Sequence, residues 1–450
     1  MRSLLGRFHR PMSRGLVNNM LTMNNLGDGS TLSLDFTTMG GVLDPRLTFT
    51  RASTVATYIN SSGYVATATT NEPRFDYSPT NIGEPRGLLI EAAATNLFSY
   101  SEDFSHGSWL KSNATASTNA TTAPDGNATA DYMLETAGTS TRFFAKDSGS
   151  PGTSTEIRTF SVYVKVLGRQ WVSLCAGTTS GGPYYRITAD LSAGTISSTD
   201  LVNSGTWFTT TPTNSISPAG PAGSGWYRIT ITSRWCQYYL ICPSNTASPS
   251  NSGSNFGLGS AYLGDTNSGV ILWGAQLELG SGASSYIPTG ASQVTRTADL
   301  CSMTGTNFSS WYTQGIGTVC WSGSAFRITA GHLANINTVN NDPRITAYVG
   351  AGSLTNLVTN GTIQVSMYFG SVTANTAFKA AWRFKTNDFA ACLNAGTVYT
   401  DNLGTVPTGV DRMQLGAAEG GYQFLDGWIK SIKYYPTALP DAQLKTLTAP

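Results

Sequence analysis

Short stretches in which apolar and polar residues alternate run through the chain from residue 31 onward. Residues 31–36 place an apolar side chain at every second position, and residues 160–166 repeat this pattern. Alternation with a period of two is typical of a β-strand that buries one face. In residues 58–65, two apolar flanks enclose Asn-Ser-Ser-Gly, which predicts a hairpin because glycine readily adopts the positive φ of a tight turn. The pattern therefore predicts an all-β protein.

Residues 269–300 mark a boundary between two such β regions. The apolar run 270–279 predicts a buried strand, and the Gly/Ser-rich residues after it predict its end. A new pattern starts at Val294. We expect two β-sandwich (jelly-roll) domains after an N-terminal attachment region. The expected divisions are an arm at 1–31, a small β module at 32–96, a jelly-roll at 97–290 and a second sandwich at 291–450.

Composition supports this architecture and narrows the classes of partner. Charged residues make up 12% of the 450 residues, about half the usual share, while glycine (48 residues) and aromatic residues (11%) are abundant. A chain of this length exceeds a single core. The net charge of +1 gives no overall field that would attract nucleic acid, and no run of about 20 apolar residues predicts membrane insertion. The first 15 residues lack the apolar core of a signal peptide.

The N-terminal arm is the one locally basic segment. Arg2, Arg7, Arg10 and Arg14 all precede Asp28, which is the first acidic residue. These arginines suit an arm that attaches to an acidic partner, and they equally suit a solvated, flexible terminus. The sequence leaves both interpretations open.

Candidate catalytic and metal-binding patterns are sparse. The acidic residues do not show the closely spaced carboxylates of sandwich glycanases, and the three histidines follow no hydrolase motif, so we expect no enzyme and no cofactor. The six cysteines form no CxxC pair, and we expect free buried thiols, with a Cys236–Cys242 bridge as the alternative. A structural calcium ion remains open, with Asp103 and Glu278 as candidate ligands.

Three strings resemble known families. The series LDPRLTFTRAST, YINSSGYV, NEPRFDY and RGLLIEAAATNL, within 43–97, resembles an N-terminal module of bacteriophage fibre and spike proteins. The series WGAQLELG, SSYIPTG and VTRTAD resembles the end of a carbohydrate-binding-type jelly-roll in virion proteins. The run GWIKSIKYY at 427–435 resembles a late strand of concanavalin A-like, laminin-G-like sandwiches.

These resemblances imply a structural virion protein: a tail fibre, a head spike or a capsid decoration protein. It would be assembled in the host cytoplasm and exposed on the particle exterior. It would contact other virion proteins through its N-terminal region, and fibres of this kind are usually homotrimers. The implied function is adhesion to a host cell-surface glycan. The alternatives are a polysaccharide-degrading enzyme with a carbohydrate-binding module, and a capsid-stabilising decoration protein without a ligand.

Aromatic residues of the jelly-roll are the candidate glycan contacts, because the apolar C–H face of a sugar stacks on an aromatic ring. Trp207 and Trp235 lie in segments without strand pattern, where exposure is expected. Tyr184 and Tyr238 begin strand-like runs and complete the candidate set. The competing interpretation of all four is core packing, which is where sandwiches place most Trp and Tyr side chains.

Overall fold

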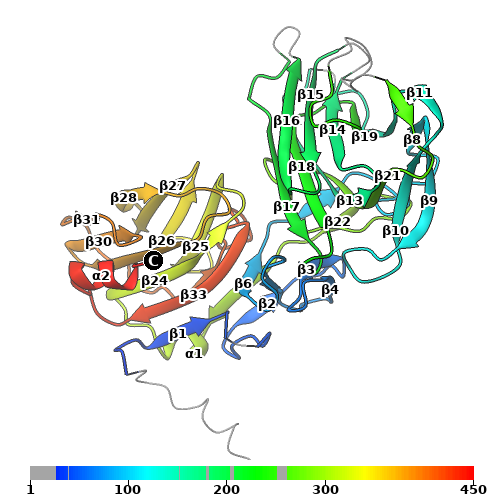
Figure 1. The fold of residues 1–450 in the computed structure, drawn as a ribbon. Helices are drawn as coiled ribbons and strands as arrows, with labels where there is room; N and C mark the ends of the chain where they lie inside the picture. The colour runs from blue at the N-terminus through cyan, green and yellow to red at the C-terminus, as the bar shows by residue number, and fades with distance from the viewer. Residues whose placement is uncertain (1–26, 39, 152, 179–181, 203–206, 251–260) are drawn as a thin grey trace, which may run out of the picture.

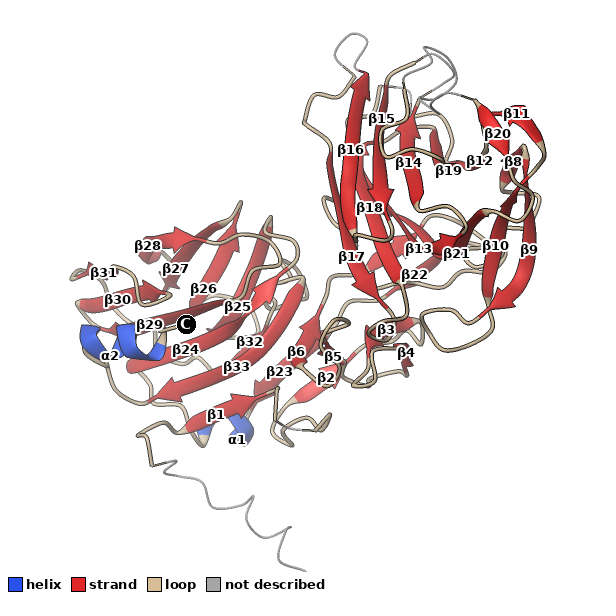
Figure 2. Cartoon of the chain, viewed as in Figure 1, coloured by secondary structure: helices blue, strands red, loops and turns tan. Residues whose placement is uncertain are grey.

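The computed structural model describes residues 27–38, 40–151, 153–178, 182–202, 207–250 and 261–450. Figure 1 shows these residues as two β lobes joined by N-terminal strands, and Figure 2 shows that helix is confined to two short segments. This confirms the all-β class and the two sandwiches. No helix in the described ranges is long and apolar enough to cross a bilayer. Arg2, Arg7, Arg10 and Arg14 lie outside the described residues.

The jelly-roll lobe consists of two antiparallel sheets of six described strands each. The first sheet has the order β17 (Thr213–Ala219), β18 (Trp226–Arg234), β13 (Ile157–Leu167), β21 (Gly269–Leu279), β10 (Ala130–Glu135) and β9 (Ala114–Thr121). The second has the order β16 (Thr195–Val202), β15 (Tyr184–Asp190), β14 (Trp171–Gly177), β19 (Tyr238–Ser244), β12 (Phe143–Asp147) and β8 (Leu110–Ser112). A separate pair joins β11 (Gly138–Ser140) to β20 (Tyr262–Gly264).

The C-terminal lobe packs an eight-stranded sheet on a seven-stranded sheet. The first contains β31 (Val398–Asp401), β30 (Asp388–Leu393), β29 (Phe378–Lys385), β24 (Ile316–Ala325), β33 (Gly427–Tyr435), β6 (Pro85–Ile90) and β5 (Phe75–Tyr77), with β1 (Leu32–Asp35) also on β33. The second contains β2 (Thr48–Thr50), β23 (Leu300–Thr304), β32 (Arg412–Leu415), β25 (Ala330–Asn337), β26 (Arg344–Gly350), β27 (Ser353–Thr359) and β28 (Ile363–Ser371). Helices α1 (Thr306–Ser309) and α2 (Asp441–Leu447) complete this lobe.

Four of the N-terminal strands, β1, β2, β5 and β6, belong to the two sheets of the C-terminal sandwich. Strand β33 pairs with β24 along one edge, while β1 and β6 share its other edge. Strand β2 in turn extends the opposite sheet through β23. The expected division at 32–96 is therefore corrected: without these strands, the edge of β33 would be left with unpaired backbone groups.

One N-terminal hairpin packs on the other lobe. Strands β3 (Ala56–Ile59) and β4 (Val65–Ala68) form the hairpin that the sequence predicts. Ile59 and Val65 pack beside Trp273 and Trp226, on the face of the first jelly-roll sheet that points away from its own core. A further pairing, β7 (Ala94–Asn96) with β22 (Val294–Arg296), lies where the chain passes between the lobes. The N-terminal segment therefore connects both sandwiches.

Several local predictions are confirmed. The alternating run 160–166 lies within β13, whose Phe160, Val162 and Val164 enter the jelly-roll core. The chain leaves the jelly-roll after β21 and enters the C-terminal sheets at β23. All six cysteines are described, free and buried, which confirms the expectation of unbridged thiols.

A buried cluster of charges lies where the chain segments meet. It contains Arg51, Arg74, Glu91, Arg296 and Asp299, each at most 1% exposed. Arg74 binds Asp299 through Nη2 and Glu91 through Nη1, the latter at 2.6 Å. Arg51 Nη1 lies 3.1 Å from Asp299 Oδ1, and Arg296 Nη2 lies 3.5 Å from Glu91 Oε2. The cluster joins the N-terminal strands to the segment that begins the C-terminal sandwich.

A second ionic group extends this cluster between the lobes. Arg327 Nη2 donates to Glu278 Oε2 at 2.8 Å, and Arg327 Nη1 lies 3.7 Å from Asp426 Oδ2. Glu278 is the penultimate residue of the long jelly-roll strand β21, whereas Arg327 and Asp426 belong to the C-terminal lobe. Asp426 Oδ1 also accepts the N–H of Ala92 at 2.8 Å, one residue after Glu91. The two groups together form what we call the ionic junction.

We expect Arg74→Met to destabilise the protein by about 3–5 kcal/mol, because it leaves Glu91 and Asp299 buried without their shared cation. Urea denaturation followed by tryptophan fluorescence measures this change. The control is Lys433→Met, which breaks the half-exposed ion pair between Lys433 and Asp28 and should cost at most about 1 kcal/mol. Equal losses in the two variants would contradict the role given to the junction.

Candidate functional site: a cleft between the lobes

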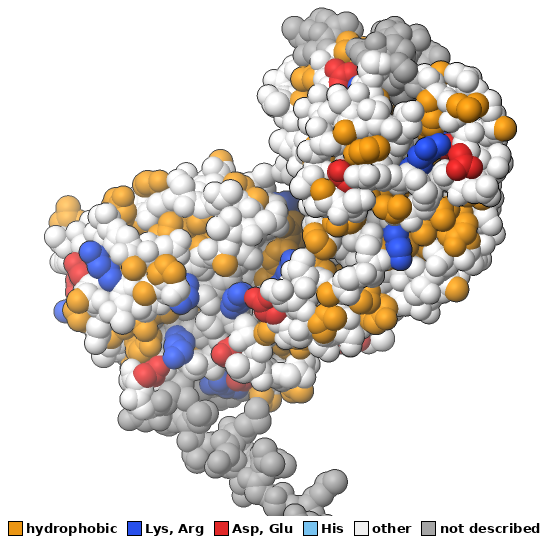
Figure 3. Space-filling model, in the orientation of Figure 1, with side chains coloured by type: hydrophobic (Ala, Val, Ile, Leu, Met, Phe, Trp, Pro, Cys, Tyr) orange, Lys and Arg blue, Asp and Glu red, His pale blue; other side chains and the backbone are white. Residues whose placement is uncertain are grey.

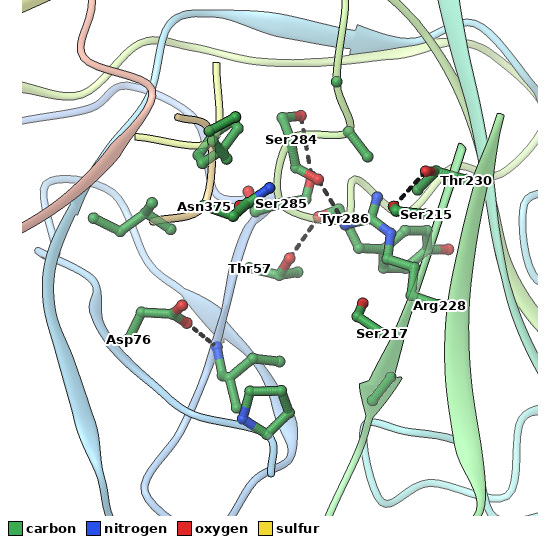
Figure 4. Close-up of a pocket in the computed structure, with 18 of the residues that line it drawn as sticks. Thr57, Asp76, Ser215, Ser217, Arg228, Thr230, Ser284, Ser285, Tyr286 and Asn375 are labelled. Carbon is green, nitrogen blue, oxygen red and sulfur yellow. Dashed lines mark hydrogen bonds between the residues drawn. The ribbon is translucent and has the colours of Figure 1, made fainter. Parts of the chain in front are cut away.

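A cleft of about 630 Å³ opens between the two sandwiches. Figure 3 shows the hollow between the lobes, and Figure 4 shows side chains from both lobes facing it. One wall is formed by β17 and β18, and the other by residues of β3, β5, β6 and the C-terminal lobe. The segment 281–286, which leads away from β21, closes the cleft beside the ionic junction. Residues from distant parts of the sequence therefore meet here.

The jelly-roll wall presents small hydroxyl side chains. Successive side chains of a strand point to opposite faces of its sheet, and in the edge strand β17 this places Thr213, Ser215 and Ser217 at the surface. The Ser215 and Thr230 hydroxyls lie 2.7 Å apart and hydrogen-bond across β17 and β18. Both line the cleft (Figure 4). The hydroxyl groups of this wall offer uncharged hydrogen-bond donors and acceptors, beside the guanidinium group of Arg228 on β18.

The opposite wall carries an indole, a carboxyl group and a guanidinium group. Trp428 Nε1 donates to Asp76 Oδ2 at 2.7 Å, and the Ile59 N–H donates to Asp76 Oδ1 at 2.5 Å. The guanidinium carbon of Arg86 lies 4.8 Å from the centre of the Trp428 ring, within the range of a cation–π interaction. The Phe326 ring meets Trp428 edge-on at 5.5 Å. The indole is thus held in one orientation by contacts on several sides.

Two charged groups give the cleft its electrostatic character. Burial raises the pKa of Asp76 to about 6, although Arg86 and the two N–H donors favour the ionised form. Arg228, on β18, donates from Nη1 to the Ser284 carbonyl at 2.7 Å and from Nη2 to the Ser161 hydroxyl at 2.9 Å. Arg228 therefore links the jelly-roll wall to the closing segment 281–286.

The aromatic residues predicted from sequence as glycan contacts lie elsewhere, on the jelly-roll lobe, and none of them lines the cleft. Tyr184 is 5% exposed and its hydroxyl donates to Asp200 Oδ2 at 2.7 Å, so its ring is not accessible for stacking on a sugar. Tyr238 is half-buried and packs against a small apolar cluster on the same sheet. For Tyr184, burial favours the packing interpretation over the binding one.

The two predicted tryptophans each lie against an arginine. The Arg234 guanidinium carbon is 4.0 Å from the Trp207 ring centre, and that of Arg158 is 3.6 Å from the Trp235 ring centre. Both rings are half-buried. The guanidinium groups therefore cover one ring face of each tryptophan.

The candidate calcium ligands are occupied by other partners. Asp103 Oδ1 accepts from the N–H groups of Ser105 and His106 at 3.0 and 3.1 Å, which makes it part of a local turn. Both carboxylate oxygens of Glu278 are engaged, one by Arg327 and the other by the Ser284 N–H at 2.8 Å. Within the described residues, no three His, Cys, Asp or Glu side chains gather as a metal site.

Sequence reasoning missed the cleft because its residues are far apart in the chain. Asp76 and Trp428 are separated by 352 positions, and their hydrogen bond depends on β6 pairing with β33. The one local signal was the alternation of hydroxyl residues along 213–217. That pattern identifies an exposed strand face but not what the face opposes.

Comparisons with known proteins give weak structural matches. No family model and no curated protein matches the sequence. Among solved structures, the CBM40 of the Ruminococcus gnavus IT-sialidase bound to α2,3 sialyllactose matches with a TM-score of 0.28 and 18% identity, over 31% of this chain and 84% of that one. The NanB sialidase from Streptococcus pneumoniae matches with a TM-score of 0.29 and 13% identity, over 32% of this chain and 26% of that one. The SAP-like pentraxin from Limulus polyphemus matches with a TM-score of 0.23 and 16% identity, over 30% and 70%. Scores this low carry no argument about the ligand of this chain.

We predict that Asp76 gives the protein a specific pH dependence. Its folded-state pKa of about 6 lies above the ordinary value of 3.8, so its contribution to stability is complete below about pH 4 and is lost as the pH rises through 6. The difference in unfolding free energy between the wild type and Asp76→Asn should therefore fall by about 2.5 kcal/mol from pH 4 to pH 7. Denaturant titrations of both proteins across this range measure it. A constant difference would show that Asp76 titrates normally.

Proposed function

We propose that the protein binds a glycan in the cleft between its lobes, without catalysis, as an exterior component of a bacteriophage virion. The observation that carries the glycan assignment is the chemistry of the cleft walls. Exposed hydroxyl groups on β17 and β18 face an oriented indole with a guanidinium group beside it. A ligand rich in hydroxyl groups and with apolar C–H faces complements both walls. Saccharides have this chemistry.

The carboxyl groups of the cleft favour binding over hydrolysis. Glycoside hydrolysis by the usual route needs two carboxyl groups that flank the scissile bond. Glu91 lines the cleft, but Arg74 and Arg296 contact it. Burial would raise the pKa of Glu91, yet Arg296, Arg74 and the Ser285 donors hold it at about 2. Asp76 alone keeps a pKa suited to proton transfer, which supports a non-catalytic cleft.

The virion assignment rests on the sequence resemblance of residues 43–97. In the fold these residues form strands of the C-terminal sandwich and the hairpin that reaches the jelly-roll. Residues 43–97 therefore fix the two sandwiches relative to each other. A rigid pair of domains suits a compact structure on the outside of a virion. We assign attachment to other virion proteins to the arm at 1–31, and the trimeric state remains a proposal from the same resemblance.

Blocking the cleft should abolish glycan binding. Ser217 is exposed on the edge strand β17 and lines the cleft, so Ser217→Trp fills the opening without disturbing a core position. We expect at least about a tenfold loss of affinity, equivalent to about 1.4 kcal/mol. The measurement is binding of the full chain to an array of bacterial capsule and lipopolysaccharide glycans.

Ser117→Trp provides the matched control. Ser117 is an exposed serine on β9, the opposite edge strand of the same sheet, and it lies outside the cleft. This variant should bind as the wild type does. Absence of any glycan binding by the wild type, or equal binding by both variants, would refute the cleft as the site.

A further inference from the structure

A second hollow, of about 300 Å³, lies on the C-terminal lobe away from the cleft. Its lining comes from the turn between β25 and β26, the turn between β27 and β28, and Tyr422. Tyr422 is 48% exposed. None of the residues that line this second hollow also lines the cleft.

Buried asparagines hold Tyr422 in place. Asn341 Nδ2 donates to the Tyr422 hydroxyl at 2.6 Å. Asn341 Oδ1 in turn accepts from Asn335 Nδ2 at 2.8 Å and from Asn337 Nδ2 at 3.2 Å. Asn335 and Asn337 are fully buried and Asn341 is 6% exposed. An exposed ring thus ends in a hydrogen bond to a buried network, which restricts its rotation.

Several features of this hydrogen-bond network reduce the stability of the fold. In the described part of the chain, Asn335 Oδ1 and Asn337 Oδ1 are buried without a hydrogen-bond partner. Asn341 also adopts a positive φ of 59°, which is unfavourable for most residues other than glycine, although asparagine tolerates it better than most. Buried polar atoms without partners reduce stability. What these features achieve together is a fixed orientation for one exposed tyrosine.

We propose that this hollow is a second saccharide site, in which a pyranose ring stacks on Tyr422. The polar rim would contact the sugar hydroxyls. Arg344 lines the hollow, and its Nη1 lies 3.5 Å from the carbonyl oxygen of Asn341, which places the guanidinium group beside the turn that carries the asparagine network. Asp342 uses Oδ1 to accept from Thr359, which leaves Oδ2 for a ligand hydroxyl. A preorganised ring loses little freedom on binding, which is what makes stacking on it effective.

The experiment isolates this site from the cleft by using Ser217→Trp as the background. The probe is an array of neutral hexose oligosaccharides, and the full chain is tested. We expect the background protein to keep binding to at least one oligosaccharide. Adding Tyr422→Ala should weaken that binding by about tenfold or more, since stacking on the ring is lost. Tyr422→Phe, which keeps the ring but loses its hydroxyl anchor, should weaken binding by a smaller factor.

Tyr399→Ala is the control, because Tyr399 is similarly exposed (39%) on β31 but does not line the hollow. It should change binding by less than about twofold, and thermal melting confirms that each variant is folded. Loss of all binding in Ser217→Trp alone would overturn the second site and leave the cleft standing. An equal effect of Tyr422→Ala and Tyr399→Ala would also overturn it. Cleft-independent binding that depends on Tyr422 would support the second site even if the cleft failed its own test.

Discussion

The ionic junction is the constraint on which the arrangement of the two lobes depends. Among the described residues it combines four guanidinium groups, of Arg51, Arg74, Arg296 and Arg327, with four carboxylates, of Glu91, Asp299, Glu278 and Asp426. The charges balance, which a buried cluster requires because an unmatched ion in a low-dielectric interior is strongly unfavourable. Apolar contacts tolerate sliding, whereas these hydrogen-bonded pairs fix distance and direction. The junction therefore sets the relative orientation of the sandwiches.

The shape of the cleft depends on this ionic junction. Glu91 accepts from the N–H and hydroxyl of Ser285, and Glu278 accepts from the N–H of Ser284. Both serines belong to the segment that closes the cleft. Arg228 then ties the carbonyl of Ser284 to the jelly-roll wall. A substitution in the buried charges would therefore alter the cleft, because a continuous chain of hydrogen bonds connects the two. Protein stability and ligand affinity should then change together.

The sequence predicts the strands better than it predicts their partners. Alternation identifies 31–36 and 160–166 because burial of one strand face is a local property. It does not show that β1 pairs with β33, four hundred residues away, since that pairing depends on which sheet edge is left open. The same limit explains the missed junction: Arg51 and Asp299 are recognisable as charges, but their burial against each other follows from the long-range topology.

The aromatic residues show what separates a binding ring from a packing ring. Tyr184, Trp207 and Trp235 were plausible sugar platforms by residue type, yet burial covers the first and arginines stack on the other two. Trp428 and Tyr422 differ because each lines a hollow of the protein, with its polar atom hydrogen-bonded to Asp76 or Asn341. A hydrogen bond to the polar atom fixes the orientation of the ring, and a position in a hollow leaves the ring accessible to a ligand. Since both conditions depend on neighbours distant in sequence, composition alone could not distinguish these rings.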